Sequence, residues 1–142
     1  MQESKDDFLT FVRQMAPTLV SDFKMGKHIE VISDKLRQLE SGEIKRLMVF
    51  LPPRSSKSVI CSKLFPAWYI GRNPEHEILT VSHSDQLSSD FGRSVRDIVD
   101  SEEFQNIFKS VKGEIKDGST EDLKIIDIWP WQNEPLFSIV FL

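Results

Sequence analysis

The first forty residues carry apolar side chains at helical spacing. A first group follows the polar segment SKDD, which supplies capping and acidic residues, and it predicts a helix that ends near Pro17. A second group, between Lys27 and Leu39, places charges opposite its apolar face, and Ser41-Gly42 closes it. The two apolar faces consist of Phe8, Phe11, Val12 and Met15, and of Ile29, Ile32, Leu36 and Leu39. We therefore expect two amphipathic helices within residues 1–44.

The centre of the chain alternates short apolar runs with helical patterns. Leu47–Leu51 is continuously apolar and is bounded by Lys45-Arg46 and Pro52-Pro53, which is typical of a strand buried on both faces of a parallel sheet. Val59–Ile70 then reads as a helix, and Pro66 within it predicts a kink or an early end.

A second strand and helix follow. Ile78–Val81 is another short apolar run, and Ser84-Asp85 begins a helical pattern that continues to Val99. Its apolar positions are Leu87, Phe91, Val95, Ile98 and Val99. The order strand, loop, helix, strand, helix predicts an α/β fold.

The segment FLPPRSSKSVI, residues 50–60, lies where a phosphate-binding loop would lie. Such a loop has a strand, four free residues between two glycines, and then Lys with Ser or Thr at the start of a helix. Aligning Lys57-Ser58 with the end of this pattern puts Leu51 and Ser56 at the two glycine positions. Ser56 adopts left-handed backbone geometry only at a cost of about 1 kcal/mol.

The loop nevertheless has the chemistry for a triphosphate. Unpaired amides and the helix dipole favour anions at a helix start. Lys57 is in place for the β and γ phosphates, the Ser58 hydroxyl for Mg²⁺, and Arg54 adds a second cation. The alternative is a Pro-Pro turn before a basic helix start, with Lys57 simply solvated.

A longer stretch, from Phe23 to Phe108, resembles the N-terminal ATPase region of phage terminase large subunits. The family has a Gly-Glu-Ile-Lys-Arg-Leu lead into the strand and a loop reading Pro-Pro-Arg-His-Gly-Lys-Ser, and Gly42–Leu47 and Pro52–Ser58 are similar to these. A family segment from Phe-Pro-Ala-Trp-Tyr to Gly-Arg-Asn-Pro resembles Phe65–Pro74. The family's Ser-x-Ser and Asp-Phe-Gly-Arg are similar to Ser82–Ser84 and Asp90–Arg93.

This resemblance implies an ATP- and Mg²⁺-dependent motor that moves double-stranded viral DNA into a capsid. The implied partners are the DNA, the portal protein, the small terminase subunit and further copies of the chain in a ring. The family loop already lacks the first glycine, but its His-Gly before the lysine is Ser55-Ser56 here, which puts nucleotide turnover in doubt. ATP would be held by Pro53, Arg54, Ser55, Ser56, Lys57 and Ser58, with Arg54 acting on the γ phosphate.

A second catalytic element would be a hydrophobic strand that ends in two acids. Leu123–Asp127 resembles the family's run ending in Ile-Ile-Asp-Asp-Pro, but Ile128 replaces the second acid. Asp127 is the candidate Mg²⁺ ligand and catalytic acid, together with the Ser58 hydroxyl on the metal. A plain surface or edge strand is the alternative interpretation.

His28 resembles by position a family residue near the adenine pocket. A surface or capping role is the alternative, because a histidine at a helix start commonly has one. His28, His76 and His83 lie on different predicted elements without metal-ligand spacing.

Composition narrows the class of protein only a little. A net charge of −4 gives no overall basic field, so any contact with DNA needs a local patch. A single cysteine, Cys61, excludes an internal disulfide and fits a reducing compartment. Since no run approaches the roughly 18 apolar residues of a membrane span, we expect a protein of the host cytoplasm.

These observations predict a P-loop NTPase-like α/β fold with a central, mostly parallel sheet flanked by helices, in incomplete form. Residues 1–44 would be a helical segment that leads into the ATPase, and residues 45–142 a partial P-loop ATPase domain without the nuclease domain. Whether the chain hydrolyses ATP stays open. The alternatives are a non-catalytic terminase-like remnant, an interaction fragment, and another nucleic-acid-dependent P-loop ATPase.

Overall fold

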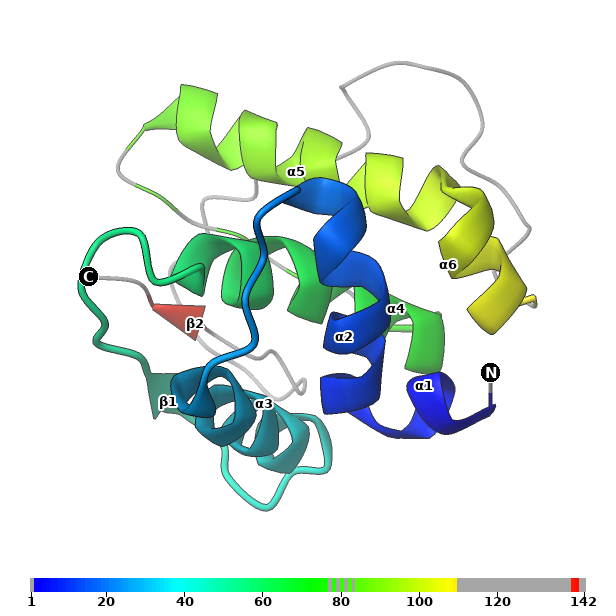
Figure 1. Ribbon diagram of the computed structural model, residues 1–142, viewed down its shortest axis with the longest axis horizontal. Helices are drawn as coiled ribbons and strands as arrows, with labels where there is room; N and C mark the ends of the chain where they lie inside the picture. Colours follow the sequence, from blue (N-terminus) through cyan, green and yellow to red (C-terminus); the bar gives the residue numbers. More distant parts are fainter. Residues whose placement is uncertain are drawn as a thin grey trace.

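The computed structural model describes residues 2–76, 78, 80, 82, 84–109 and 139–140. This part of the chain is mostly helical (Figure 1). Its elements, in chain order, are α1 (Gln2–Asp6), α2 (Phe8–Leu19), α3 (Lys27–Glu40), β1 (Leu47–Met48), the π-helical η1 (Val59–Leu64), α4 (Phe65–Arg72), α5 (Asp85–Asp100), α6 (Glu102–Ile107) and β2 (Ile139–Val140).

The predicted α/β fold with a central parallel sheet is wrong. β1 and β2 pair in parallel, Leu47 with Ile139 and Met48 with Val140, and they are the only strands within the described ranges. The described residues of the second predicted strand, Ile78 and Thr80, lie outside any strand. The hydrophobic core therefore forms between helices and not on the faces of a sheet.

The prediction that Leu47–Leu51 is a strand buried on both faces is wrong, because only one face of the run is buried. Leu47, Val49 and Leu51 pack against the core, whereas Met48 and Phe50 are 57% and 68% exposed. The run thus alternates between core and solvent, as in a strand covered on one face. A continuous apolar run is therefore compatible with burial on one face as well as on two.

The two predicted N-terminal helices are confirmed, with small differences at their ends. α2 begins after Asp7, whose carboxylate accepts a hydrogen bond from the Thr10 amide at 2.9 Å. It contains Pro17 and runs on to Leu19. The predicted apolar faces of α2 and α3 are buried at each position: Phe8, Phe11, Val12 and Met15, then Ile29, Ile32, Leu36 and Leu39.

The helical run from Lys57 to Arg72 occupies the middle of the fold. It starts at Lys57, continues through η1 and becomes α4 without a break. η1 contacts α2, α3 and α5, and α4 contacts α1, α2 and α5, so the run is enclosed by the other helices (Figure 1). From Ile60 to Tyr69, every residue except Lys63 is buried.

Pro66 explains the change in winding inside this run. Proline has no amide hydrogen and therefore cannot donate the bond that continues a regular α-helix. Just before it, the Phe65 amide donates to the Ile60 carbonyl, five residues back, which is the π-helical spacing. The expected kink or early end is thus replaced by wider winding, and the helix continues to Arg72.

Aromatic side chains join the N-terminal helices to this central run. The ring of Phe8 lies 5.5 Å from that of Phe65, edge to face, and 5.1 Å from that of Trp68. Phe11 approaches Phe104 and Phe108 on the other side, with ring centroids 6.1 Å from each. Such pairs each contribute about 0.5–1.5 kcal/mol beyond the burial of their area.

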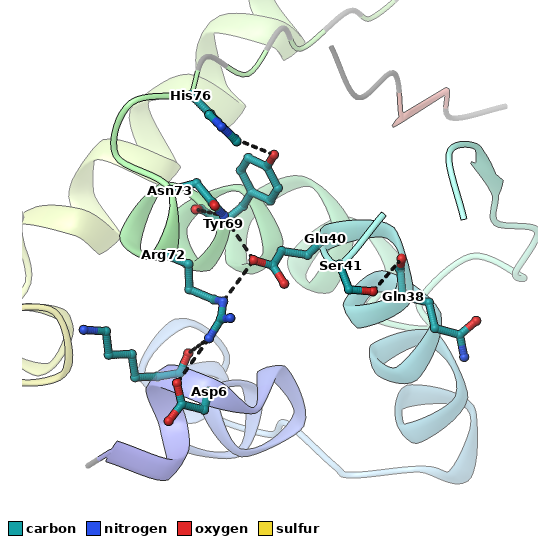
Figure 2. A network of polar contacts seen from close by, with 9 residues as sticks. Asp6, Gln38, Glu40, Ser41, Tyr69, Arg72, Asn73 and His76 are labelled. Carbon is teal, nitrogen blue, oxygen red and sulfur yellow. Dashed lines mark hydrogen bonds and ion pairs between the residues drawn. The ribbon is translucent and has the colours of Figure 1, made fainter. Parts of the chain in front are cut away.

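A cluster of polar contacts at the end of α4 ties three helices together (Figure 2). Arg72 donates from Nε to the Glu40 carboxylate at 3.0 Å and from Nη1 to the Lys5 carbonyl at 2.9 Å. Asn73 donates to the same Glu40 oxygen at 3.1 Å. The Glu40 side chain is only 11% exposed, and the Arg72 guanidinium lies 5.1 Å from the centre of the Trp68 ring. This contact set, which we call the Arg72 clamp, joins the ends of α1, α3 and α4.

None of the helices in residues 2–76 and 84–109 has the length and apolar character needed to cross a bilayer.

Gly71 has a packing role that leads to a testable expectation. A Cβ at this position would lie 2.8 Å from two atoms of the Phe108 ring, and Phe108 is fully buried. Gly71→Ala should therefore lower the free energy of unfolding by about 1–3 kcal/mol, as overpacking does, although alanine normally stabilises a helix. Urea denaturation gives the value.

Combining Gly71→Ala with Phe108→Leu provides the control, because the smaller side chain makes room for the new methyl group. The double variant should lose less stability than the sum of the two single losses. A Gly71→Ala protein more stable than the wild type would show that the two segments are not packed in this way.

Candidate phosphate-binding loop

The candidate site is the loop Pro53–Ser58, between the end of the β1 run and the start of the central helix. Two of its residues have left-handed backbone geometry without being glycine: Arg54 with φ 63° and Ser56 with φ 61°. The Ser55 hydroxyl donates to the Pro52 carbonyl at 2.7 Å and holds the turn closed. The first bond of the helix runs from the Ile60 amide to the Ser56 carbonyl at 3.0 Å.

This backbone has the shape of an anion-binding concavity. Ser56 is left-handed and the residues after it are helical, and such a pair turns successive amides toward the same side of the chain. The amides of Lys57, Ser58 and Val59 have no acceptor within the helix, because a helix start leaves its first amides unpaired. Positive potential from the helix dipole acts at the same place.

Ser56 thus adopts the conformation for which related loops use glycine. The sequence suggested that the missing glycine would weaken the loop, since a side chain in left-handed geometry costs roughly 1 kcal/mol. The structure keeps that conformation at Ser56 despite the cost. Strain of this kind persists only where the surroundings determine it, and here the buried helix that follows fixes the end of the loop.

The cationic side chains of the loop are open to solvent. Arg54 is exposed and Lys57 is half-buried. Among the described residues, neither forms an ion pair. The Ser58 hydroxyl is also exposed, at the first turn of the helix. The Ser55 hydroxyl, by contrast, already has its partner, so only the amide of Ser55 is left for a ligand.

His28 is not joined to this loop. It lies in the first turn of α3, where its exposed ring covers Gly26 so closely that a Cβ there would be 2.6 Å from two ring atoms. In the described part of the chain no hydrogen bond or ion pair links it to the loop. Its predicted position near the adenine stays a prediction.

Asp127, the predicted metal ligand and catalytic acid, lies outside the described residues. Within the described ranges, no group of three or more His, Cys, Asp or Glu side chains could hold a metal ion. A phosphate-bound Mg²⁺ does not need such a group, because it commonly keeps several waters and takes one or two protein ligands. Ser58 is the described candidate for that role.

Cys61 lies one turn after Lys57 and is fully buried. Burial raises the pKa of the Cys61 thiol to about 12, and the positive charge of Lys57 offsets part of that rise. The thiol is therefore neutral at physiological pH and serves as a small apolar group, as its position in the sequence suggested.

Sequence reasoning missed the Arg72 clamp. It gave Arg72 no role, whereas Arg72 and Asn73 both donate to Glu40. The available signal was Glu40 itself, an acid at the end of an amphipathic helix directly beside its apolar face. Pairing between residues more than thirty positions apart cannot be read from a single sequence.

Comparison of the chain with family models, with curated proteins and with solved structures finds no match in any of the three.

The raised pKa of Cys61 predicts a loss of stability at alkaline pH. The thiol has an ordinary pKa of 9.0 and a folded pKa of about 12, so the unfolded chain loses its proton first. The contribution of the protonated thiol to the free energy of unfolding is complete below pH 9. It falls as the pH rises toward 12, by at most about 1.4 kcal/mol per pH unit. Cys61→Ala removes this dependence.

Urea denaturation of both proteins at pH 8, 9 and 10 tests the expectation. The pKa of Tyr69 is also raised, by burial and by the charge of Glu40, but it is present in both proteins and cancels in the comparison. If the free energy of unfolding changes with pH by the same amount in wild type and Cys61→Ala across this range, the thiol titrates normally in the folded protein and the expectation is wrong.

Proposed function

We propose that the loop Pro53–Ser58 binds the triphosphate of ATP and that the chain acts as the ATPase region of a terminase-like DNA-packaging subunit. The observation that carries the first part is the left-handed backbone at Ser56 directly before the helix that starts at Lys57. The second part rests on the motif resemblance from Phe23 to Phe108. The first part does not depend on a central sheet, because the loop's own backbone and side chains supply the contacts to phosphate.

Each part of the loop has a role in this proposal. The amides of Ser56, Lys57 and Ser58 donate to phosphate oxygens, as at other helix starts that bind phosphate. Lys57 neutralises the β and γ phosphates, and Arg54 approaches the γ phosphate from the exposed side of the turn. The Ser58 hydroxyl ligates Mg²⁺, which supplies charge neutralisation when it is bound. Asp127 remains the candidate second ligand.

The motor function and its partners belong to the same proposal. Double-stranded viral DNA, a portal protein, a small terminase subunit and a ring of identical subunits follow from the resemblance, as does action in the host cytoplasm. Hydrolysis needs a group that orients the attacking water. Without a second acid after Asp127, we propose slow turnover at most.

A non-catalytic terminase-like fragment is the second candidate function. The observation that favours it is the short β1, in which only Leu47 and Met48 of the apolar run form a strand. A phosphate-binding loop normally extends from a longer strand that fixes its first residues. The two candidates differ in whether the loop binds nucleotide.

Titration with ATP and Mg²⁺ tests the proposal. We expect saturable binding to the wild type that weakens by about tenfold in Lys57→Ala, because a charge-assisted contact to phosphate is lost. Ser56→Gly should keep an affinity close to that of the wild type, because the left-handed conformation is already present in the unbound protein and its strain does not change on binding. Isothermal titration calorimetry or a fluorescent ATP analogue provides the affinities.

Lys35→Ala is the matched control, since Lys35 is an exposed lysine of α3 that contacts only Gln38. It should leave the affinity unchanged. Absence of binding in both wild type and Ser56→Gly, with thermal unfolding curves showing both folded, would reject the nucleotide site and favour the non-catalytic fragment.

A further inference from the structure

Two large apolar side chains project toward solvent at the end of β1, one from the strand itself and one from the second residue after it. Met48 is 57% exposed and Phe50 is 68% exposed, while the intervening Val49 packs against the core. Residues two apart in an extended chain point to the same side, about 6.6 Å apart. Arg46 is also exposed and precedes Met48 by two positions. We call Arg46, Met48 and Phe50 the β1 stripe.

The β1 stripe differs from the other exposed apolar positions. Among the residues that the structure describes, the other large apolar side chains with substantial exposure are Leu19, Met25 and Val31, and they lie on or near α2 and α3. Single exposed apolar residues need no explanation, but adjacent ones on one face mark interaction sites. Phe50 is the most exposed of the large apolar side chains that the structure describes.

The charges at the two ends of the stripe indicate what covers it. Arg46 and Arg54 flank the apolar pair, and within the described residues neither has an ion-pair partner. Every other arginine of the chain does: Arg13, Arg37, Arg72, Arg93 and Arg96. Lys45 is a third exposed cation beside the stripe. A binding partner that complements these charges and the apolar pair carries apolar side chains between carboxylates.

We infer that the β1 stripe is a docking surface for an acidic, apolar segment of another protein. Phe50 and Met48 anchor the partner's apolar side chains, since aromatic and methionine residues are enriched at the centres of interfaces. Arg46 and Lys45 pair with its carboxylates. A symmetric contact between two copies is disfavoured because the same cations would face one another.

A peptide titration tests this inference directly. The probe is a fluorescein-labelled synthetic peptide in which glutamate alternates with leucine and phenylalanine. Two further peptides serve as comparisons, one with lysine in place of glutamate and one with serine in place of the apolar residues. Fluorescence anisotropy should show saturable binding of the first peptide, much weaker binding of the other two, and weakening with added salt because exposed charges are screened.

Matched variants assign the binding to the stripe. Phe50→Ser should weaken it about tenfold as an anchor residue, and Arg46→Ser about threefold as a rim charge. The controls are Val31→Ser, which removes an apolar residue of α3 that is 57% exposed, and Arg13→Ser, which removes an exposed arginine. Both should leave the affinity unchanged. Circular dichroism melts establish that all four variants fold.

Any one of four results would overturn the inference. The first is equal affinity for the glutamate and lysine peptides, and the second is binding that Phe50→Ser does not weaken. The third is concentration-dependent self-association in sedimentation that Phe50→Ser abolishes, which would make a second copy of the chain the occupant. Tighter binding of a single-stranded oligonucleotide than of the glutamate peptide at the stripe would also contradict a protein partner.

Discussion

Burial of the helical run Lys57–Arg72 is the constraint on which the rest of the described structure depends. A helix that is apolar around most of its circumference has to be surrounded, and α1, α2, α3 and α5 all contact this one. Ile60, Cys61, Leu64, Ala67 and Trp68 have no exposed surface. Fully burying large apolar side chains contributes about 1.5–3 kcal/mol for each, so this helix makes a large contribution to the stability of the described fold.

The two ends of this helix have different consequences. At its end, Arg72 binds Glu40 and the Lys5 carbonyl, which fixes α1 and α3 against it (Figure 2). At its start, the chain turns sharply before it enters the core at Lys57, and Ser56 has the left-handed conformation in this turn. The helix therefore provides the rigid support on which an anion-binding turn can be held in a strained shape.

The sequence allowed the helices to be predicted but not the arrangement that they form. Apolar spacing located α2, α3 and α5; α2 and α3 bury their predicted faces, and α5 buries Ile98 and Val99. A capping side chain marked the start of α2, at Asp7, and of α5, at Ser84. Leu47–Met48 does form a strand, β1, but the expected burial of Leu47–Leu51 on both faces was wrong: the run is as apolar as a doubly buried strand, yet Phe50 faces solvent. Periodicity within one segment cannot report which neighbours cover it.

The candidate site was predictable to a similar extent. Lys57 and Ser58 were placed correctly at a helix start by their position after the apolar run. The left-handed geometry of Arg54 could not be foreseen, because nothing in a serine- and arginine-containing turn specifies it and glycine usually provides it. The contacts of Glu40 with Arg72 and Asn73 depend on long-range packing and were likewise beyond local reasoning.

Native-state hydrogen exchange followed by NMR tests the central role of the Lys57–Arg72 helix most directly. Amides in the buried interior of this helix, such as those of Ala67, Trp68 and Tyr69, should exchange only through global unfolding and be the slowest in the protein. Amides in the less buried first half of α5 should exchange faster through local opening. Exchange in α4 that is as fast as in α5 would show that this helix is not the core on which the fold is built.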